Sequence, residues 1–76
     1  DWTVYPNPAG DRVNIQVAPH AGTYQLELST IEGRTLQQWK GSEQNSTLNT
    51  SNLQPGLYLL QLITDQGRYT KKIIKE

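Results

Sequence analysis

Apolar and polar residues alternate along most of the chain, with the two-residue period that is typical of half-buried β-strands. Residues 11–17 give the cleanest example, because Val13, Ile15 and Val17 share one face while the residues between them are polar. No stretch shows the 3.6-residue period of an amphipathic helix. Further strands are predicted at residues 1–5, 23–30, 34–40, 46–50, 57–64 and 68–75.

Turn residues separate these strands about every 8–12 residues, a spacing that is typical of β-sandwiches. Pro55-Gly56 is a turn signal, and Asp65-Gln66-Gly67 predicts a short hairpin loop. Glu32-Gly33 predicts a two-residue hairpin turn in which the glycine supplies a positive φ. The fold class predicted for residues 1–76 is therefore all-β, a single immunoglobulin-like antiparallel β-sandwich of about seven strands.

The predicted strand at residues 57–64 carries the longest apolar run of the chain. Its alternate residues place one apolar set on one face, namely Tyr58, Leu60 and Leu62. A second apolar set falls on the other face, namely Leu57, Leu59 and Ile63. We therefore expect this strand to be covered on both faces. The register of the following strand stays open, because a one-residue slip would exchange Ile73 and Ile74 between the two faces.

Charge and composition narrow the range of functions. The 76 residues include seven Lys plus Arg, seven Asp plus Glu and no Cys, so the formal net charge is zero. A nucleic-acid binder needs a basic surface that displaces counterions from phosphates, so this class is not expected. The lack of Cys excludes disulfides and thiolate metal sites. The lysines are nonetheless unevenly spread, since three of the four lie in the last six residues: Lys71, Lys72 and Lys75.

The chain shows no pattern of a catalytic, metal or cofactor site. His20 is the single histidine, and no Cys or acidic residue lies within five positions of it, so a solvated loop histidine is the favoured interpretation. Neither a nucleophile-elbow motif nor a glycine-rich phosphate loop occurs. We predict that the chain is not an enzyme and binds no metal or cofactor.

The sequence contains no Met and begins at Asp1, so we expect a domain that was excised from or processed off a larger secreted protein. It shows no signal peptide and no apolar run long enough for a membrane-spanning helix. An export signal is therefore expected upstream of Asp1, on the parent protein.

Several short motifs occur in a fixed order along the chain. Val4-Tyr5-Pro6-Asn7-Pro8-Ala9 lies near the start, and Ile31-Glu32-Gly33-Arg34 forms a turn after a middle strand. Gly56-Leu57-Tyr58 leads into the apolar strand, and Lys71-Lys72-Ile73-Ile74-Lys75 lies at the end. This order resembles the C-terminal sorting domain of type IX secretion cargo proteins in Bacteroidota. The resemblance covers nearly all of the chain.

The resemblance implies a folded signal that directs a larger cargo protein through the periplasm and across the outer membrane, to the cell surface or the medium. The implied partners are the type IX translocon, a cell-surface sortase that removes the domain, and the cargo upstream of Asp1. The implied recognition residues are Gly56, Leu57, Tyr58, Lys71, Lys72, Ile73, Ile74 and Lys75. The implied domain-opening residues are Tyr5, Pro6, Asn7 and Pro8.

Two interpretations of the terminal lysines stay open. They could protect an edge strand against unwanted pairing, or Lys72 and Lys75 could meet an acidic receptor groove. An exposed last strand could also accept a partner strand or pair with a second copy as a homodimer.

An alternative function comes from a different class. The domain could be an accessory carbohydrate- or protein-binding module of a secreted multidomain enzyme. A third possibility is that the domain is retained and used as a membrane-surface anchor for its parent. Exposure of Trp2 and Trp39 together on one open face would favour the binding module. Burial of both, with the Leu57–Lys75 edge as the open feature, would favour the sorting signal.

Overall fold

The computed structural model of the chain describes residues 2–6, 9–18 and 22–76. These residues form seven β-strands, which confirms the predicted all-β class. None of the described residues belongs to a helix with the length and apolar character needed to cross a membrane. The strands are β1 (Trp2–Tyr5), β2 (Arg12–Val17), β3 (Tyr24–Thr30), β4 (Thr35–Gly41), β5 (Asn45–Asn49), β6 (Gly56–Thr64) and β7 (Gly67–Lys75).

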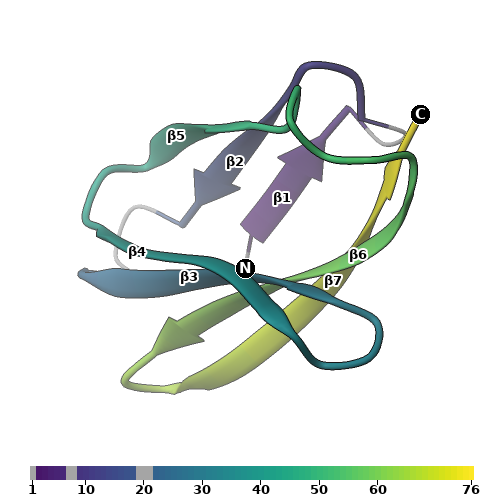
Figure 1. Cartoon of the computed structure of the whole chain (residues 1–76). Coiled ribbons are helices and arrows are strands. Elements are labelled where there is room, and N and C mark those ends of the chain that lie inside the picture. Colours follow the sequence, from purple (N-terminus) through teal and green to yellow (C-terminus); the bar gives the residue numbers. More distant parts are fainter. Residues whose placement is uncertain (1, 7–8, 19–21) are drawn as a thin grey trace.

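The strands form two antiparallel sheets that pack face to face (Figure 1). One sheet has the order β1-β2-β5, and the other has the order β4-β3-β6-β7. The β3–β4 and β6–β7 connections are hairpins within one sheet, whereas the chain crosses between the sheets after β2, β4 and β5. The last strand, β7, therefore lies at an edge of the four-stranded sheet.

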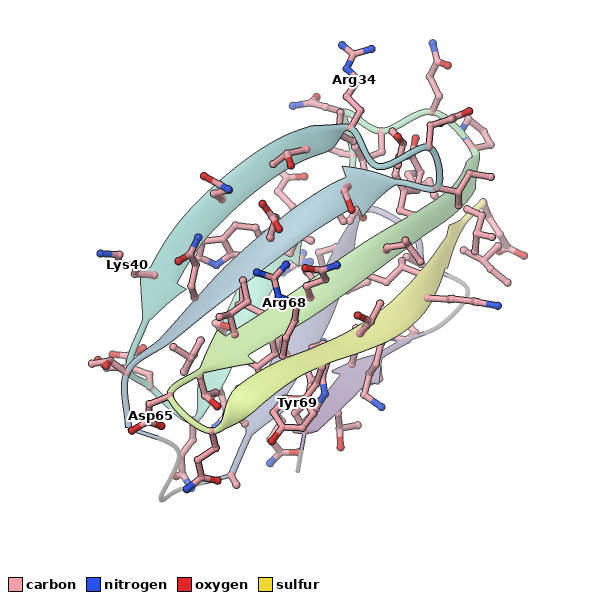
Figure 2. The ribbon with its side chains drawn as sticks, turned by 90° about the horizontal axis from the view of Figure 1, so that it is seen from below. Arg34, Lys40, Asp65, Arg68 and Tyr69 are labelled. Carbon is pink, nitrogen blue, oxygen red and sulfur yellow. The ribbon has the colours of Figure 1, made fainter. Side chains whose placement is uncertain are left out.

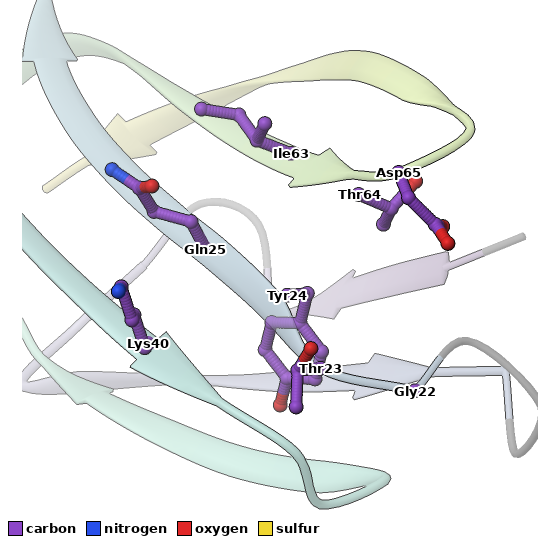
Figure 3. A pocket seen from close by; sticks show the side chains of 8 residues that line it. All are labelled: Gly22, Thr23, Tyr24, Gln25, Lys40, Ile63, Thr64 and Asp65. Carbon is purple, nitrogen blue, oxygen red and sulfur yellow. The ribbon is translucent and has the colours of Figure 1, made fainter.

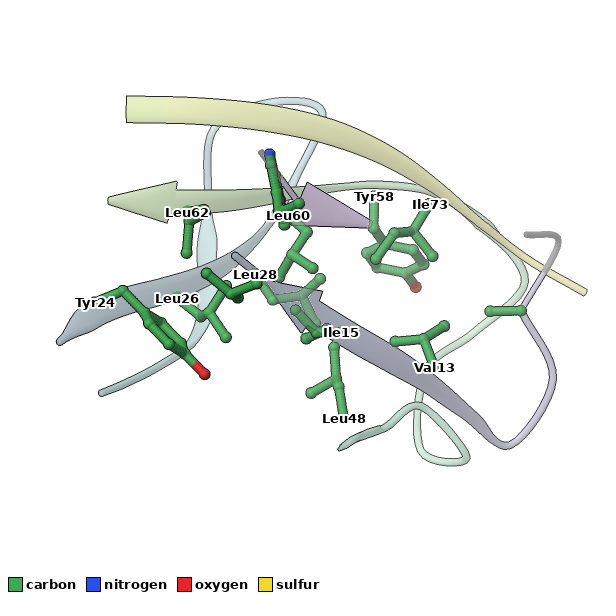
Figure 4. Packing of buried hydrophobic residues seen from close by; sticks show 13 residues of the cluster. Val13, Ile15, Tyr24, Leu26, Leu28, Leu48, Tyr58, Leu60, Leu62 and Ile73 are labelled. Carbon is green, nitrogen blue, oxygen red and sulfur yellow. The ribbon is translucent and has the colours of Figure 1, made fainter. Parts of the chain in front are cut away.

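The core lies between the sheets and consists of the inward sets that the alternation predicts (Figure 4). Because successive side chains of a strand point to opposite faces, every second residue of β2, β3 and β6 enters the core. Leu36, Trp39 and Leu53 are partly buried and pack against it. The buried apolar residues are Trp2, Ala9, Val13, Ile15, Val17, Tyr24, Leu26, Leu28, Leu48, Tyr58, Leu60, Leu62 and Ile73.

The prediction that β6 is covered on both faces was wrong. Leu57 is 39% exposed, and Leu59 and Ile63 are only partly buried. Among the described residues, no second layer lies over this face of the four-stranded sheet (Figure 2). The outward apolar side chains of β6 are shielded only by its neighbours within the sheet, since β6 lies between β3 and β7.

The first hairpin turn is longer than predicted. The amide of Gly33 donates to the carbonyl of Thr30 at 2.9 Å, and the amide of Thr30 donates to the carbonyl of Arg34 at 2.9 Å. These bonds enclose Ile31, Glu32 and Gly33, so the connection has three residues instead of two. Gly33 has the predicted positive φ, at +96°. A turn that ends in a left-handed glycine adds one residue and still matches the strand twist.

Candidate functional site

Two of the motif segments are hydrogen-bonded neighbours. The β6–β7 register pairs Gly56 with Lys75, Leu57 with Ile74, and Tyr58 with Ile73. The start of the apolar strand thus lies directly beside the end of the chain. We call this region the motif end, and define it as residues 56–58, residues 73–76 and Ala9.

Ala9 brings the N-terminal motif to the same place. Its amide donates to the carbonyl of Ile74 at 2.6 Å, and its carbonyl accepts from the amide of Glu76 at 3.1 Å. This parallel bridge occupies the free edge of β7 at Lys75, so a partner strand could not pair there. Ala9 is fully buried.

The domain-opening residues are only partly described. Tyr5 and Pro6 are exposed at the end of β1 and after it, whereas Asn7 and Pro8 lie outside the described residues.

Thr50 fixes the residues that follow Ala9. Its hydroxyl donates to the carbonyl of Gly10 at 2.6 Å, and its amide donates to the carbonyl of Asp11 at 2.8 Å. The side chain is fully buried, and both polar groups are satisfied, as buried polar groups must be. Residues 9–11 therefore connect the two sheets at the motif end.

Sequence reasoning missed both anchors of this segment. In the sequence, Ala9 is only the last residue of the N-terminal motif. Thr50 is the last residue of a polar stretch whose pattern predicts a strand only weakly. A buried threonine that bonds to a distant carbonyl leaves no periodic trace in a sequence.

The structure settles the register of the last strand. Ile73 points into the core and is 1% exposed, whereas Ile74 points outward and is 48% exposed. Lys72 is exposed on the outward side with Ile74, and Lys71 and Lys75 alternate with Ile73 on the other side. The predicted recognition residues therefore divide into buried and exposed sets.

Gly56 and Tyr58 have structural roles in the Gly-Leu-Tyr segment. Tyr58 is buried, and its hydroxyl donates to the carbonyl of Gln54 at 2.7 Å, which fixes the turn before β6. Gly56 has φ +152°, a conformation that other residues rarely adopt. Leu57, between them, points away from the core and is the exposed member of the three.

The terminal lysines have different surroundings. The ammonium group of Lys71 lies 5.5 Å from the centroid of the Trp2 ring, a cation–π geometry that links β7 to β1. The ammonium group of Lys75 donates to the carbonyl of Glu76 at 3.1 Å. Because Lys72 and Lys75 lie on opposite faces of β7, they do not present their charges on one surface.

Trp2 and Trp39 do not form an open aromatic platform. Trp2 is 8% exposed in the three-stranded sheet, and Trp39 is partly buried against the core in the four-stranded sheet. The arrangement that would favour a carbohydrate-binding module is therefore not present.

A polar hollow of about 490 Å³ lies at the opposite end of the four-stranded sheet (Figure 3). Its charged lining residues are Lys40 and Asp65. The described residues contain no group of three or more His, Cys, Asp or Glu that could hold a metal ion. His20 lies outside the described residues, and the absence of enzyme activity, metal and cofactor stays a prediction.

The comparisons with known proteins agree with the geometry. No curated protein matches the chain significantly. A family model described as a secretion system C-terminal sorting domain matches residues 3–76, a range that includes every motif segment described above. The predicted resemblance is thereby confirmed. The chain belongs to the family of type IX secretion C-terminal sorting domains, which direct a cargo protein to the cell surface or the extracellular space.

Proposed function

We propose that the motif end is the part of this sorting signal that the type IX machinery reads, and that the domain is read in its folded state. The observation that carries the proposal is the convergence of three distant segments: backbone bonds join Ala9 to β7 and β7 to the start of β6. An unfolded chain would not hold these segments together. A receptor that requires all three therefore reads the folded domain.

Burial assigns different tasks to the recognition residues. Tyr58 and Ile73 are core residues, so they support the shape of the motif end without contacting a receptor. Leu57, Lys72 and Ile74 are exposed on one face, where a translocon component can contact them. Gly56 acts through its backbone conformation.

We also propose where a surface sortase cuts the chain. Trp2 is buried and pairs with Val17, and the remaining residues of β1 are paired with β2. Proteolysis needs an accessible, extended segment, which a paired strand with a buried Trp2 does not provide. We therefore place the cleavage junction upstream of Trp2, in the connection to the cargo.

The test uses a reporter with a Sec signal that is fused upstream of Asp1 and expressed in a type IX-competent bacterium. We expect the fusion to reach the surface or the medium, and the reporter without the domain to stay in the periplasm. An isogenic strain without the type IX translocon is the control, and the fusion should stay in its periplasm. Export of the fusion from that strain, or its retention in the competent strain, would contradict the proposed function.

A further inference from the structure

The uncovered face of the four-stranded sheet is apolar at one end and polar at the other. Figure 2 shows this face, with Arg34 at the motif end and Asp65 at the opposite end. The strand registers define the side chains that share it, because residues paired across neighbouring strands point to the same face. The face can thus be described level by level, starting from the motif end.

The first level is entirely apolar. Leu57 of β6 pairs with Ile74 of β7. Ile31 directly follows Thr30, the last residue of β3 that pairs with β6, and begins the β3–β4 turn at the same end of the sheet as Leu57. Ile31 is 57% exposed, and all three residues are among the exposed large hydrophobic residues of the domain.

The second level adds one cation to this apolar row. Leu59 pairs with Lys72 on one side and with Ser29 on the other. Leu59 is partly buried, and Lys72 is exposed. We call the set Ile31, Leu57, Leu59, Lys72 and Ile74 the outer-face patch.

Beyond Leu59, the outward side chains of the strands are polar except for Ile63, and several of them bond to one another. The carboxylate of Glu27 accepts hydrogen bonds from Gln38 at 2.6 Å and from Thr35 at 3.3 Å. Arg68 donates to the side-chain oxygen of Gln61 at 2.8 Å. This half of the face therefore presents mainly polar side chains.

The one charged residue of the outer-face patch is the cation Lys72, which is exposed. A partner that presents carboxylates would meet a complementary surface, and a second copy of the same face would not.

We propose that the outer-face patch docks an amphipathic segment of a type IX component, one that presents apolar side chains beside carboxylates. Single exposed apolar residues are ordinary, but a contiguous row is typical of interaction sites. The apolar row would be buried at the centre of the contact, while Lys72 would meet a carboxylate at its rim. The inference rests on the proposed function, and it adds Ile31, which lies outside the terminal motifs.

Two variants test the patch in the reporter fusion. The triple variant Ile31→Thr/Leu57→Thr/Ile74→Thr removes the apolar row, and Thr keeps the β-branched character that strands favour. Because truncation of central apolar contacts weakens binding by about tenfold or more, we expect at least that loss of exported reporter. Lys72→Glu should also reduce export. Lys72→Arg keeps the positive charge and should be exported as well as the wild-type fusion.

Matched controls lie outside the patch. Tyr69→Thr removes an aromatic side chain of similar exposure from the other end of β7, and Lys40→Glu reverses a charge at the polar end of the same face. Both should leave export unchanged. Thermal unfolding of each purified domain checks that the variants are folded, and a variant with a lowered midpoint is replaced by the single substitutions.

A competition experiment separates docking from cargo transport. The 76-residue domain without cargo, carrying a Sec signal, is overproduced in the reporter strain. The wild-type domain should reduce reporter export, and the triple variant should not. If the wild-type fusion is not exported, the proposed function fails. If it is exported and the folded triple variant is exported equally well, or competes equally well, the docking inference fails.

Size-exclusion chromatography of the purified domain tests whether the patch binds a second copy of the domain. A monomer at every concentration is expected, because like charges would face each other in a symmetric dimer through this face. A dimer that the triple variant dissociates would overturn the inference and assign the patch to a second copy of the chain.

Discussion

The two faces of the β6–β7 hairpin carry similar apolar residues in opposite environments. Ile73 is 1% exposed and Ile74 is 48% exposed, although they are neighbours in the chain. Their cross-strand partners repeat the difference, since Tyr58 is buried and Leu57 is exposed. The strand period alone produces this division, because successive side chains point to opposite faces.

This difference shows how the terminal motif should be interpreted. A run of five residues in a strand is not a continuous surface, and a receptor on the outer face reaches only Lys72 and Ile74. A substitution at Ile73 acts on the core, so its effect on export would come through folding. Only the outward residues can separate recognition from stability.

The largest effect is expected when residues 71–76 are deleted. This change removes Ile73 from the core and both backbone bonds of Ala9, one to Ile74 and one to Glu76. A core of this size rarely supplies more than about 3–5 kcal/mol of net stability. Since truncating a buried Ile to Ala alone costs about 2–5 kcal/mol, the shortened domain should be unfolded at room temperature. Far-UV circular dichroism and urea titration of the purified domain measure this.

Matched substitutions on the two faces test the comparison within the intact chain. Ile73→Ala should cost most of the stability of the domain, whereas Ile74→Ala should stay within about 0.5 kcal/mol, as exposed substitutions usually do. Ile74→Ala also keeps the carbonyl that accepts from Ala9. Similar urea midpoints for the two variants would show that the faces are not energetically different. Loss of export after the six-residue deletion would then need another cause than unfolding.

The alternation of apolar residues predicted the strands and most of the core. Val13, Ile15 and Val17 share one buried face in the structure, as expected. The prediction succeeded because burial of one sheet face imposes a period of two that the sequence must carry. It failed for the outer face of β6, because apolar content alone does not tell a covered face from one that is left open.

The assembly of the candidate site could not be predicted in the same way. Motif order suggested that the segments act together, but the bridge from Ala9 to Ile74 joins backbones and has no residue signature. The register of β7 was equally open, since both candidate faces carried an Ile. The pairing of β3 with β6 brings the β3–β4 turn, which begins at Ile31, to the same end of the sheet as Leu57, and local pattern does not determine that long-range pairing.

Gly56→Ala should lower the stability of the domain by an intermediate amount. It tests the division of the Gly-Leu-Tyr segment into two structural residues, Gly56 and Tyr58, and one exposed residue, Leu57. Nothing lies within 4 Å of a Cβ added at Gly56, so the expected cost comes from its φ of +152°. Such conformations cost about 1–3 kcal/mol in residues other than Gly. Gly10→Ala is the control, because its Cβ position is also open and its φ is not positive. Equal urea midpoints for the two variants would show that the backbone conformation of Gly56 gives it no special structural role.

The smallest effect is expected from Lys71, one of the two inward lysines of β7. Lys71→Met keeps the unbranched stem but removes the charge that lies 5.5 Å from the Trp2 ring. Exposed cation–π pairs contribute about 0.5–1 kcal/mol, so the urea midpoint should fall slightly. In a double-mutant cycle, Lys71→Met should lose its effect when Trp2 is replaced by Leu. Lys40→Met, on the far edge strand, should show no such coupling. If Lys71 also shows none, this pair does not stabilise the contact between β1 and β7.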